Sequence, residues 1–215
     1  MRCIVTAGPT YESLDNVRRL TNFSTGQLGC ELANFLISHG HDVTLLIGQQ
    51  ATHCGKRQAR MVETFSTTAD LRQRLSLMSS QLVGAVFHAA AVSDFKFGKL
   101  WLRTEQGELT EVKSGKISTR MGTLLAELVP TTKIIKELRD WFPVARLVGW
   151  KYEVEGERAA VIALAQKQIS ECSTDACVAN GAAYGPGFGL VTRSAGCTHL
   201  DDTQALFEIL ESQLH

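Results

Sequence analysis

Residues 2–29 read RCIVTAGPTYESLDNVRRLTNFSTGQLG, and this stretch decides the fold class. Its first six residues form a β-branched apolar run that stops at Gly8, which predicts a buried strand followed by a turn. A long loop bracketed by Gly8 and Gly29 comes next. Apolar residues then recur at helical spacing up to Gly40, a usual helix stop, so a helix is expected over about 26–38.

The same order of strand and helix repeats along the chain. Further strands are expected at 41–47, 61–65, 84–91, 145–150 and 176–180, and further helices at 68–78, 132–140, 156–170 and 203–213. Near-continuous apolar strands that alternate with helices are typical of a parallel sheet covered on both faces. The sequence therefore predicts an α/β fold with a doubly wound, mostly parallel, Rossmann-like sheet in three layers.

The alternation breaks between Val92 and Val129. This stretch is polar and rich in Lys, Thr and Gly, and its candidate strands, 99–102 and 124–128, fall outside the main pattern. We interpret it as an insertion of β-strands and loops in one domain that spans residues 1–215, a length that a single large domain can have.

Bulk composition excludes several classes of protein. Lysine plus arginine and aspartate plus glutamate number 22 each, so no net basic field favours nucleic acid. No apolar run approaches the ~20 residues that span a bilayer, and the first strand follows Met1 without a signal peptide. The six cysteines form no Cys-x-x-Cys pair, which argues against a zinc site or a disulfide scaffold. We expect a cytoplasmic protein with no protein-bound metal and no nucleic-acid or membrane partner.

The loop after the first strand holds the most informative residues. A dinucleotide fingerprint would place three glycines just after this strand, and it is absent here. Instead, Ser24, Thr25 and Gly26 fall at the expected helix N-terminus, where free backbone N–H groups suit a phosphate or carboxylate. Asn22 offers an amide donor and an acceptor, and Arg18 could bind an anion or be a solvated surface charge. A capped helix behind an irregular loop is the plainer alternative.

A second group of candidates follows the fourth expected strand. Ligands of open parallel sheets bind outside the carboxyl ends of the strands, so this group should lie near the first loop. The small residues Ala89, Ala90 and Ala91 would let backbone approach a flat ring. Asp94 could bind a ligand or cap a turn, and His88 inside the strand is more often a satisfied core histidine.

Taken together, the motifs of this chain resemble phosphopantothenoylcysteine synthetase. The matching stretches, in the family's order, are Thr6–Thr10, Asn22–Gly26, Ala89–Asp94, Lys116–Ile117, Leu128–Pro130, Val148–Trp150 and Val178–Asn180. The resemblance covers most of the chain, and the first three motifs in combination are specific. It implies a stand-alone form, without the flavin-dependent decarboxylase that is often fused ahead of this domain.

The resemblance implies a ligase of coenzyme A biosynthesis. In this family the carboxylate of 4′-phosphopantothenate attacks the α-phosphorus of CTP or ATP, with Mg²⁺, and L-cysteine then displaces the nucleotide from the acyl-nucleotidylate. A homodimer is also implied, and the Val92–Val129 insertion is a natural place for one copy to cover a neighbouring site.

By residue match, the resemblance implies catalytic roles for Asn22, which would contact the acyl intermediate, and for Lys116. Bacterial members usually carry Lys-Ile-Lys-Lys where this chain has Lys116-Ile-Ser-Thr119, with Lys113 as the second candidate lysine. The implied substrate-binding residues are Arg18, Ser24, Thr25, Gly26 and Ala91. The implied nucleotide-binding residues are Gly8, His88, Ala89, Ala90, Asp94, Thr132, Lys133, Ile134, Ile135, Trp150 and Lys167.

Two other functions stay open at this point. The alternation of strands and helices also fits an NAD(P)-binding reductase of the short-chain type, although the tight glycine fingerprint and the Tyr-x-x-x-Lys pair are missing. A non-catalytic homologue that binds a phosphorylated ligand is the third possibility, because the lysines differ from the family pattern.

Overall fold

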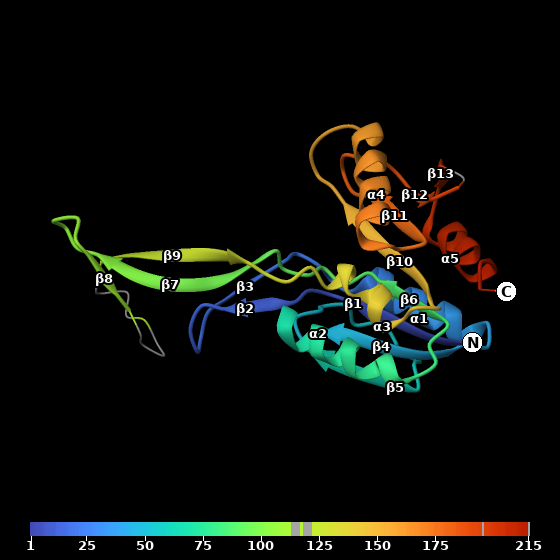
Figure 1. The fold of residues 1–215 in the computed structure, drawn as a ribbon, viewed down its shortest axis with the longest axis horizontal. Helices are drawn as coiled ribbons and strands as arrows, with labels where there is room; N and C mark the ends of the chain where they lie inside the picture. Colours follow the sequence, from blue (N-terminus) through green and yellow to red (C-terminus); the bar gives the residue numbers. More distant parts are fainter. Residues whose placement is uncertain (113–116, 118–121, 195, 215) are drawn as a thin grey trace.

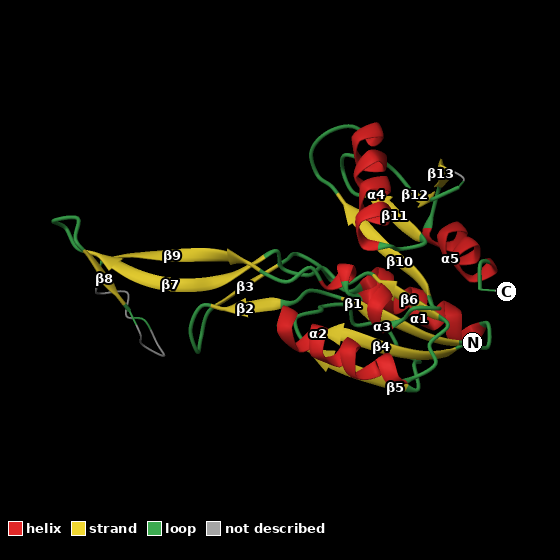
Figure 2. Ribbon diagram, viewed as in Figure 1, coloured by secondary structure: helices red, strands yellow, loops and turns green. Residues whose placement is uncertain are grey.

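A computed structural model describes residues 1–112, 117, 122–194 and 196–214. Its main sheet has eight strands in the order β13-β12-β11-β10-β6-β1-β4-β5 (Figures 1 and 2). They are β1 (Arg2–Ala7), β4 (Asp42–Gly48), β5 (Met61–Phe65), β6 (Ala85–His88), β10 (Arg146–Tyr152), β11 (Ala176–Asn180), β12 (Phe188–Thr192) and β13 (Gly196–Leu200). The run from β5 to β11 is parallel throughout, and the chain order reverses between β1 and β6. The predicted doubly wound α/β fold is confirmed.

Helices cover both faces of this sheet. One layer contains α1 (Gln27–Ser38) and α5 (Thr203–Ser212), and the other contains α2 (Thr68–Leu77), the short helices η3 (Ile134–Lys136) and α3 (Leu138–Trp141), and α4 (Arg158–Cys172). A 3₁₀ turn, η1 (Met78–Ser80), extends α2. Strand side chains alternate between the faces: Cys3 and Val5 pack with α1, whereas Ile4 packs on the α2 side.

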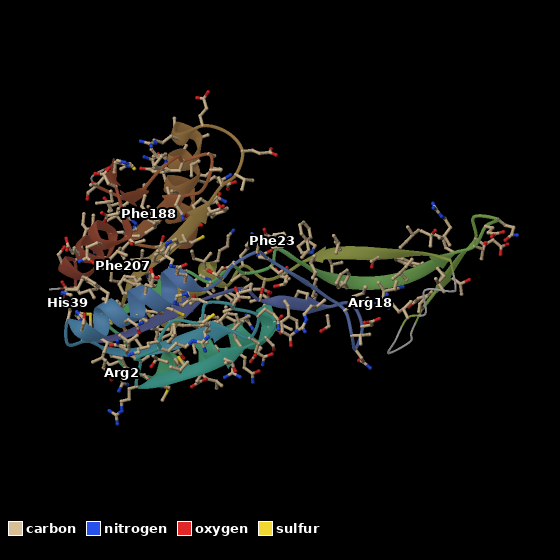
Figure 3. The ribbon with its side chains drawn as sticks, turned by 180° about the vertical axis from the view of Figure 1, so that it is seen from behind. Arg2, Arg18, Phe23, His39, Phe188 and Phe207 are labelled. Carbon is tan, nitrogen blue, oxygen red and sulfur yellow. The ribbon has the colours of Figure 1, made fainter. Side chains whose placement is uncertain are left out.

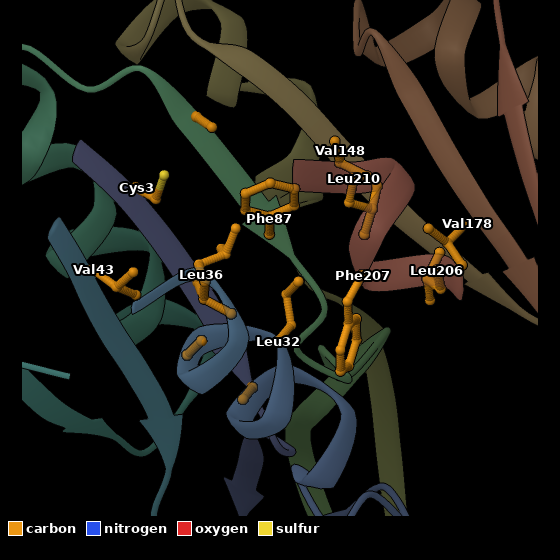
Figure 4. Close-up of a cluster of buried hydrophobic side chains, with 14 of the residues drawn as sticks. Cys3, Leu32, Leu36, Val43, Phe87, Val148, Val178, Leu206, Phe207 and Leu210 are labelled. Carbon is orange, nitrogen blue, oxygen red and sulfur yellow. The ribbon is translucent and has the colours of Figure 1, made fainter. Parts of the chain in front are cut away.

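The core between the sheet and the first helical layer consists of buried apolar side chains. Leu32 and Leu36 of α1 and Phe207 of α5 point toward Phe87 and Val178 of the sheet (Figure 4). Each of these side chains is at most 5% exposed. This packing fixes the N-terminus of α1 against the ends of the central strands, where the candidate site lies.

Five further strands lie outside the main sheet. The hairpin of β2 (Tyr11–Ser13) and β3 (Arg19–Thr21) belongs to the loop after β1, and β7 (Phe95–Arg103), β8 (Leu109–Glu111) and β9 (Thr123–Pro130) form a separate three-stranded sheet. We call residues 11–21 and the described residues of 95–130 the arm, and the rest of the described chain the body. The arm extends from one end of the body in Figure 1, and β2 contacts β7.

The structure corrects the expected helix over 132–140. Only η3 and α3 form there, because Thr131 is bound to the neighbouring loop: its N–H donates to the Asp94 carbonyl at 2.9 Å and its hydroxyl donates to the Ser93 carbonyl. The sequence analysis also missed β2, β3, β8, β12 and β13. In the described part of the chain, no helix is long and apolar enough to cross a membrane.

Candidate functional site

A cleft of about 770 Å³ lies at the carboxyl ends of the central parallel strands. Its walls come from the loops after β1, β6, β10 and β11 and from the first turn of α1. The centre of this cleft is the point between β1 and β6 where the strand order reverses. Open α/β sheets bind their ligands at such a point.

Two glycines shape the floor of the cleft. Gly8 ends β1 with φ 75° and Gly26 precedes α1 with φ 79°, both in the left-handed region that favours glycine. A Cβ atom on Gly26 would lie only 3.3 Å from the Gly8 Cα. The strand end and the helix start therefore touch, and a side chain on Gly26 would push them apart, whereas a Cβ atom on Gly8 would lie 2.8 Å from the Ala51 Cβ.

The N-terminus of α1 opens into the cleft. Gly26, at the N-cap position, has no side chain to satisfy the first backbone N–H groups, and the Gln27 N–H donates to the Thr25 hydroxyl at 3.2 Å. Leu28 and Gly29, the next residues of this first turn, line the cleft. An oxyanion there would meet unpaired N–H groups and the positive end of the helix dipole.

Asn22 ties the loop after β1 to the loop after β6. Its side-chain Nδ2 donates to the carbonyls of Ala91 and Val92, each at 3.3 Å, and the residue is exposed to the cleft. Both bonds are long for N–H···O contacts. A ligand oxygen could thus accept one of the two amide hydrogens, and the chain would lose only one long internal hydrogen bond.

His88 is held as a neutral imidazole. The Thr6 hydroxyl accepts a bond from the Ala90 N–H at 3.1 Å and lies 3.0 Å from His88 Nδ1. If the Thr6 hydrogen points at Nδ1, the imidazole proton is on Nε2. Burial lowers the pKa of His88 to about 4, because the charged form would lose its hydration. His88 lines the cleft as a neutral group at ordinary pH.

Charged side chains are few at the cleft wall. Asp94 pairs with Lys133, and Lys151 Nζ lies 2.8 Å from Glu153 Oε1. The side chains of the first pair are 60–63% exposed, whereas those of the second are about one-third exposed. The second pair is therefore the better shielded from solvent.

Two buried polar atoms at the cleft have no described hydrogen-bond partner. They are Trp150 Nε1, a donor, and Asn180 Oδ1, an acceptor. Both side chains project from the same face of the sheet, since Trp150 pairs with Val178 and Asn180 pairs with Tyr152 across β10 and β11. Orphaned buried groups are costly, so this donor and acceptor are suited to a polar ligand.

Most of the residues implied by the motifs meet in this cleft. Those that line it are Gly8, Asn22, Ser24, Thr25, Gly26, His88, Ala89, Ala90, Ala91, Asp94, Thr132, Lys133, Ile134, Ile135 and Trp150. Lys167 does not reach it: its Nζ lies 3.7 Å from Glu171 on the exposed side of α4. Lys113 and Lys116 lie outside the described residues.

Arg18 is also absent from the cleft and lies on the arm instead. Its guanidinium donates to the Asp15 carboxylate and to the Ile117 carbonyl, and the bond to Asp15 holds the pKa of that carboxyl well below its usual range. Figure 3 shows Arg18 well away from Phe23, which is fully exposed at the cleft. A role for Arg18 in this chain's own cleft has no support in its position.

The site roles implied by the motifs leave out several residues of the cleft wall, although Phe23 and Asn180 fall inside matched stretches. The residues without an assigned role are Phe23, Gln27, Lys151, Tyr152, Val154, Gln168 and Asn180. The expected strand over 145–150 ended too early, and β10 continues to Tyr152. Extending the alternation of this strand by two residues would have placed Lys151 and Tyr152 on its two faces at the cleft.

A second cavity, of about 510 Å³, lies at the opposite ends of β10 and β11. Arg139, one of its lining residues, donates to the carbonyls of Pro143, Ala145 and Ser173 and to the Asp175 carboxylate. This arginine, on α3, connects the two loops that precede β10 and β11, which is a structural role. The cleft at the carboxyl ends is the functional candidate.

Comparison with known proteins assigns the family. A family model described as the DNA/pantothenate metabolism flavoprotein C-terminal domain matches residues 1–209. The chain belongs to this family. The relationship predicted from the motifs of the sequence is thereby confirmed.

Relatives in this family include the coenzyme A biosynthesis bifunctional protein CoaBC of Thermococcus kodakarensis, which is 33% identical over 183 residues. That match covers 83% of this chain and 41% of the relative, so the chain spans less than half of the length of that protein.

Solved structures agree with the fold. The DNA/pantothenate metabolism flavoprotein from Streptococcus pneumoniae has a TM-score of 0.86 at 24% identity, with 100% of this chain and 98% of that chain covered. A Cab2 mutant in complex with phosphopantothenate-cysteine has a TM-score of 0.74 at 18% identity, covering 99% and 84% of the two chains.

Proposed function

We propose that this protein joins 4′-phosphopantothenate to L-cysteine in coenzyme A biosynthesis, with CTP or ATP as the activating nucleotide. Family membership supports the reaction class, and a structural neighbour was solved with phosphopantothenate-cysteine. The observation that carries the proposal is the cleft itself. It brings Asn22, the open N-terminus of α1 and the unpaired polar atoms of Trp150 and Asn180 into one cavity.

The proposed reaction has two steps. First, a carboxylate oxygen of phosphopantothenate forms a bond to the α-phosphorus of the nucleotide, and the bond to pyrophosphate breaks. The amine of cysteine then forms a bond to the activated acyl carbon and loses a proton, while the acyl–oxygen bond breaks and the nucleoside monophosphate leaves. Negative charge develops on the acyl oxygen in the second step, so a nearby N–H donor lowers the barrier.

The cleft residues divide naturally between the two substrates. The N-terminus of α1 suits an anionic group, and Asn22 beside it can give one amide hydrogen to the acyl oxygen. On the β10 and β11 side, Trp150 and Asn180 offer a ring, a donor and an acceptor to a nucleoside. His88, neutral between these two parts, can donate from Nε2 but is a poor general base, since its pKa is about 4.

Mg²⁺ fits this site as part of the metal–nucleotide complex. Asp94 is the carboxylate that lines the cleft, and the described residues contain no group of three or more His, Cys, Asp and Glu side chains that could hold a metal. Mg²⁺ is commonly bound through one or two carboxylates together with substrate phosphates. When bound, it would neutralise charge on the phosphate chain, and Asp94 would be its ligand from the protein.

We further infer that the protein is a homodimer in which the arm of one copy reaches the cleft of the other. Large apolar side chains remain exposed on the arm: Leu20, Phe95, Leu109 and Leu128 are 38–56% exposed. Arg18 lies in the connection between β2 and β3 of the same arm, and its Nη1 has no described bond. The role in phosphopantothenate binding that the motifs imply for Arg18 is then possible only in the partner's cleft.

Pyrophosphate release tests the proposed ligase activity. Purified protein is supplied with CTP or ATP, in parallel, with Mg²⁺ and with or without phosphopantothenate. Release that needs both nucleotide and phosphopantothenate, followed by formation of phosphopantothenoylcysteine when cysteine is added, is the expected result. If neither nucleotide supports release but both bind, the protein is a binding homologue and the proposal is wrong.

A further inference from the structure

Lys151 stands out among the cleft residues that the motifs do not explain. It is the second-last residue of β10, it follows Trp150 directly, and it lines the cleft. Its Nζ lies 2.8 Å from Glu153 Oε1, with both side chains about one-third exposed. Glu153 does not itself line the cleft, so the ammonium group is the part of this ion pair that a ligand in the cleft would meet.

The position of Lys151 in β10 places it on the α4 face of the sheet. Successive strand residues point to opposite faces, and Trp150 packs in the core on the α1 and α5 side. Gly149, two residues before Lys151, faces α4: a Cβ atom there would lie 2.4 Å from Gln168 Nε2. Lys151 thus occupies the wall of the cleft where the motifs led us to expect a lysine from α4.

The α4 helix supplies no such lysine to the described cleft wall. Its residue at the wall is the neutral Gln168, whereas Lys167 points to solvent and is paired with Glu171. The cations that line the described cleft are Lys133, which is paired with Asp94, and Lys151. A polyanion on the α4 side would therefore meet Lys151.

We infer that Lys151 binds the phosphate chain of the nucleotide and so replaces, from a strand, the phosphate-binding lysine that α4 lacks. This inference rests on the proposed function, because it assigns the anion as the nucleotide of that reaction. In the free protein Glu153 holds the ammonium group at the wall. A phosphate oxygen then takes the place of the Glu153 carboxylate, and no covalent step involves Lys151.

Nucleotide binding by Lys151 variants tests the inference without relying on turnover. The dissociation constants of Mg-ATP and Mg-CTP are measured by calorimetry for the wild-type protein, K151M and K151R, with K167M as the matched control. We expect K151M to weaken the preferred nucleotide about tenfold or more, a usual effect of losing a charged hydrogen bond. K151R should recover most of the affinity, and K167M should bind like the wild type.

A purely structural role for Lys151 predicts a different pattern. E153Q removes the ion pair but keeps the lysine, so on our account it binds nucleotide at least as tightly as the wild type. If E153Q and K151M instead lower the melting temperature alike and leave nucleotide affinity unchanged, the inference is overturned. It is also overturned if the wild type binds neither nucleotide. If the wild type binds nucleotide and K151M binds weakly, but no pyrophosphate is released, the inference stands and the ligase proposal fails.

Discussion

The strands of the body are buried, whereas the strands of the arm are largely exposed. In the body, strand after strand is buried on both faces, and β6 is buried along its whole length. In the arm, β3 and β8 are exposed throughout, and most residues of β7 and β9 are exposed or half-buried. The arm thus buries too little apolar surface to be held by its own core.

This difference in burial indicates that the two regions have different roles. The packed body fixes the cleft, since the Gly8–Gly26 contact and the Thr6–His88 bond belong to its central strands and to the start of α1. The arm keeps its apolar side chains and Arg18 available for another surface. Body substitutions should therefore change the stability of one chain, and arm substitutions should change how two chains associate.

Leu46→Ala in β4 should have the largest effect on stability. Leu46 is 0% exposed in the core on the α2 side. Removing its side chain should lower the free energy of unfolding by about 4 kcal/mol. Leu128→Ala, on the exposed β9, is the matched control and should cost less than about 1 kcal/mol at a protein concentration low enough to keep the chains monomeric. Chemical denaturation measures both; equal losses would contradict the contrast between body and arm.

His88 should make the stability of the body depend on pH. Its pKa is lowered to about 4 by burial, so between that value and its ordinary value of 6.5 the unfolded chain binds more protons than the folded one. The contribution of His88 to the free energy of unfolding is therefore fully present above pH 6.5. It decreases as the pH falls toward 4, by at most about 3 kcal/mol.

Denaturation curves between pH 4 and 7.5 check this prediction. His88→Asn should flatten the dependence, whereas His39→Asn, at an exposed position, should leave it as in the wild type. An unchanged slope in the His88 variant would show that another group causes it.

The double variant Phe95→Ser/Leu128→Ser should weaken self-association without unfolding the body. These side chains are 45% and 50% exposed on the arm. If they are buried between two copies, their loss should raise the dimer dissociation constant about 30-fold or more in sedimentation velocity. Val144→Ser, an equally apolar truncation at a 79% exposed position of the body, is the control. A monomeric wild type, or a double variant that associates normally, would contradict the dimer proposal.

Arg18→Ala should have the smallest effect on binding of these substitutions. We expect an about tenfold higher KM for phosphopantothenate, since one charged contact is lost, together with a lower melting temperature, since the buried Asp15 carboxylate loses its guanidinium partner. Mixing this variant with Asn22→Asp tests whether Arg18 of one chain acts in the cleft of the other. A mixed dimer would then have one cleft with both an intact Asn22 and an intact Arg18. Random mixing of equal amounts that restores activity to roughly a quarter of the wild-type sites supports an arm that acts on the partner's cleft. Activity no higher than the average of the two parents would rule that out.

The sequence predicted the body well because local signals and burial agree there. Strands such as β1 and β11 are apolar runs that end at turn residues, and α1 ends before Gly40. Prediction failed where pairing alone makes a strand: β2 and β3 have three residues each, and β13 is half polar. The expected helix over 132–140 was lost to tertiary hydrogen bonds of Thr131.

For the site, the sequence identified which strand ends matter but not which side chains face the cleft. Asn22, Gly26 and Trp150 were expected and lie there. Lys167 was expected at the cleft, but the neighbouring Gln168 holds the position of α4 that faces it, and Lys167 lies on the exposed side of the helix. Lys151 was given no role, because the strand was expected to end at Trp150, whereas the end of β10 depends on its pairing with β11.

Asn22 is the residue on which this account depends most. Asn22→Asp keeps the shape of the side chain, but it replaces an amide donor by a carboxylate that would repel the developing negative charge. We expect the body to remain folded and pyrophosphate to be released once per site, while the second step stalls.

Mass spectrometry of the quenched Asn22→Asp reaction is the most direct measurement. With phosphopantothenate, the preferred nucleotide and cysteine present, the account predicts that the acyl-nucleotidylate accumulates, whereas the wild type converts it to phosphopantothenoylcysteine. Wild-type turnover by the folded variant, without any accumulated intermediate, would contradict the role of Asn22 and of the cleft built around it.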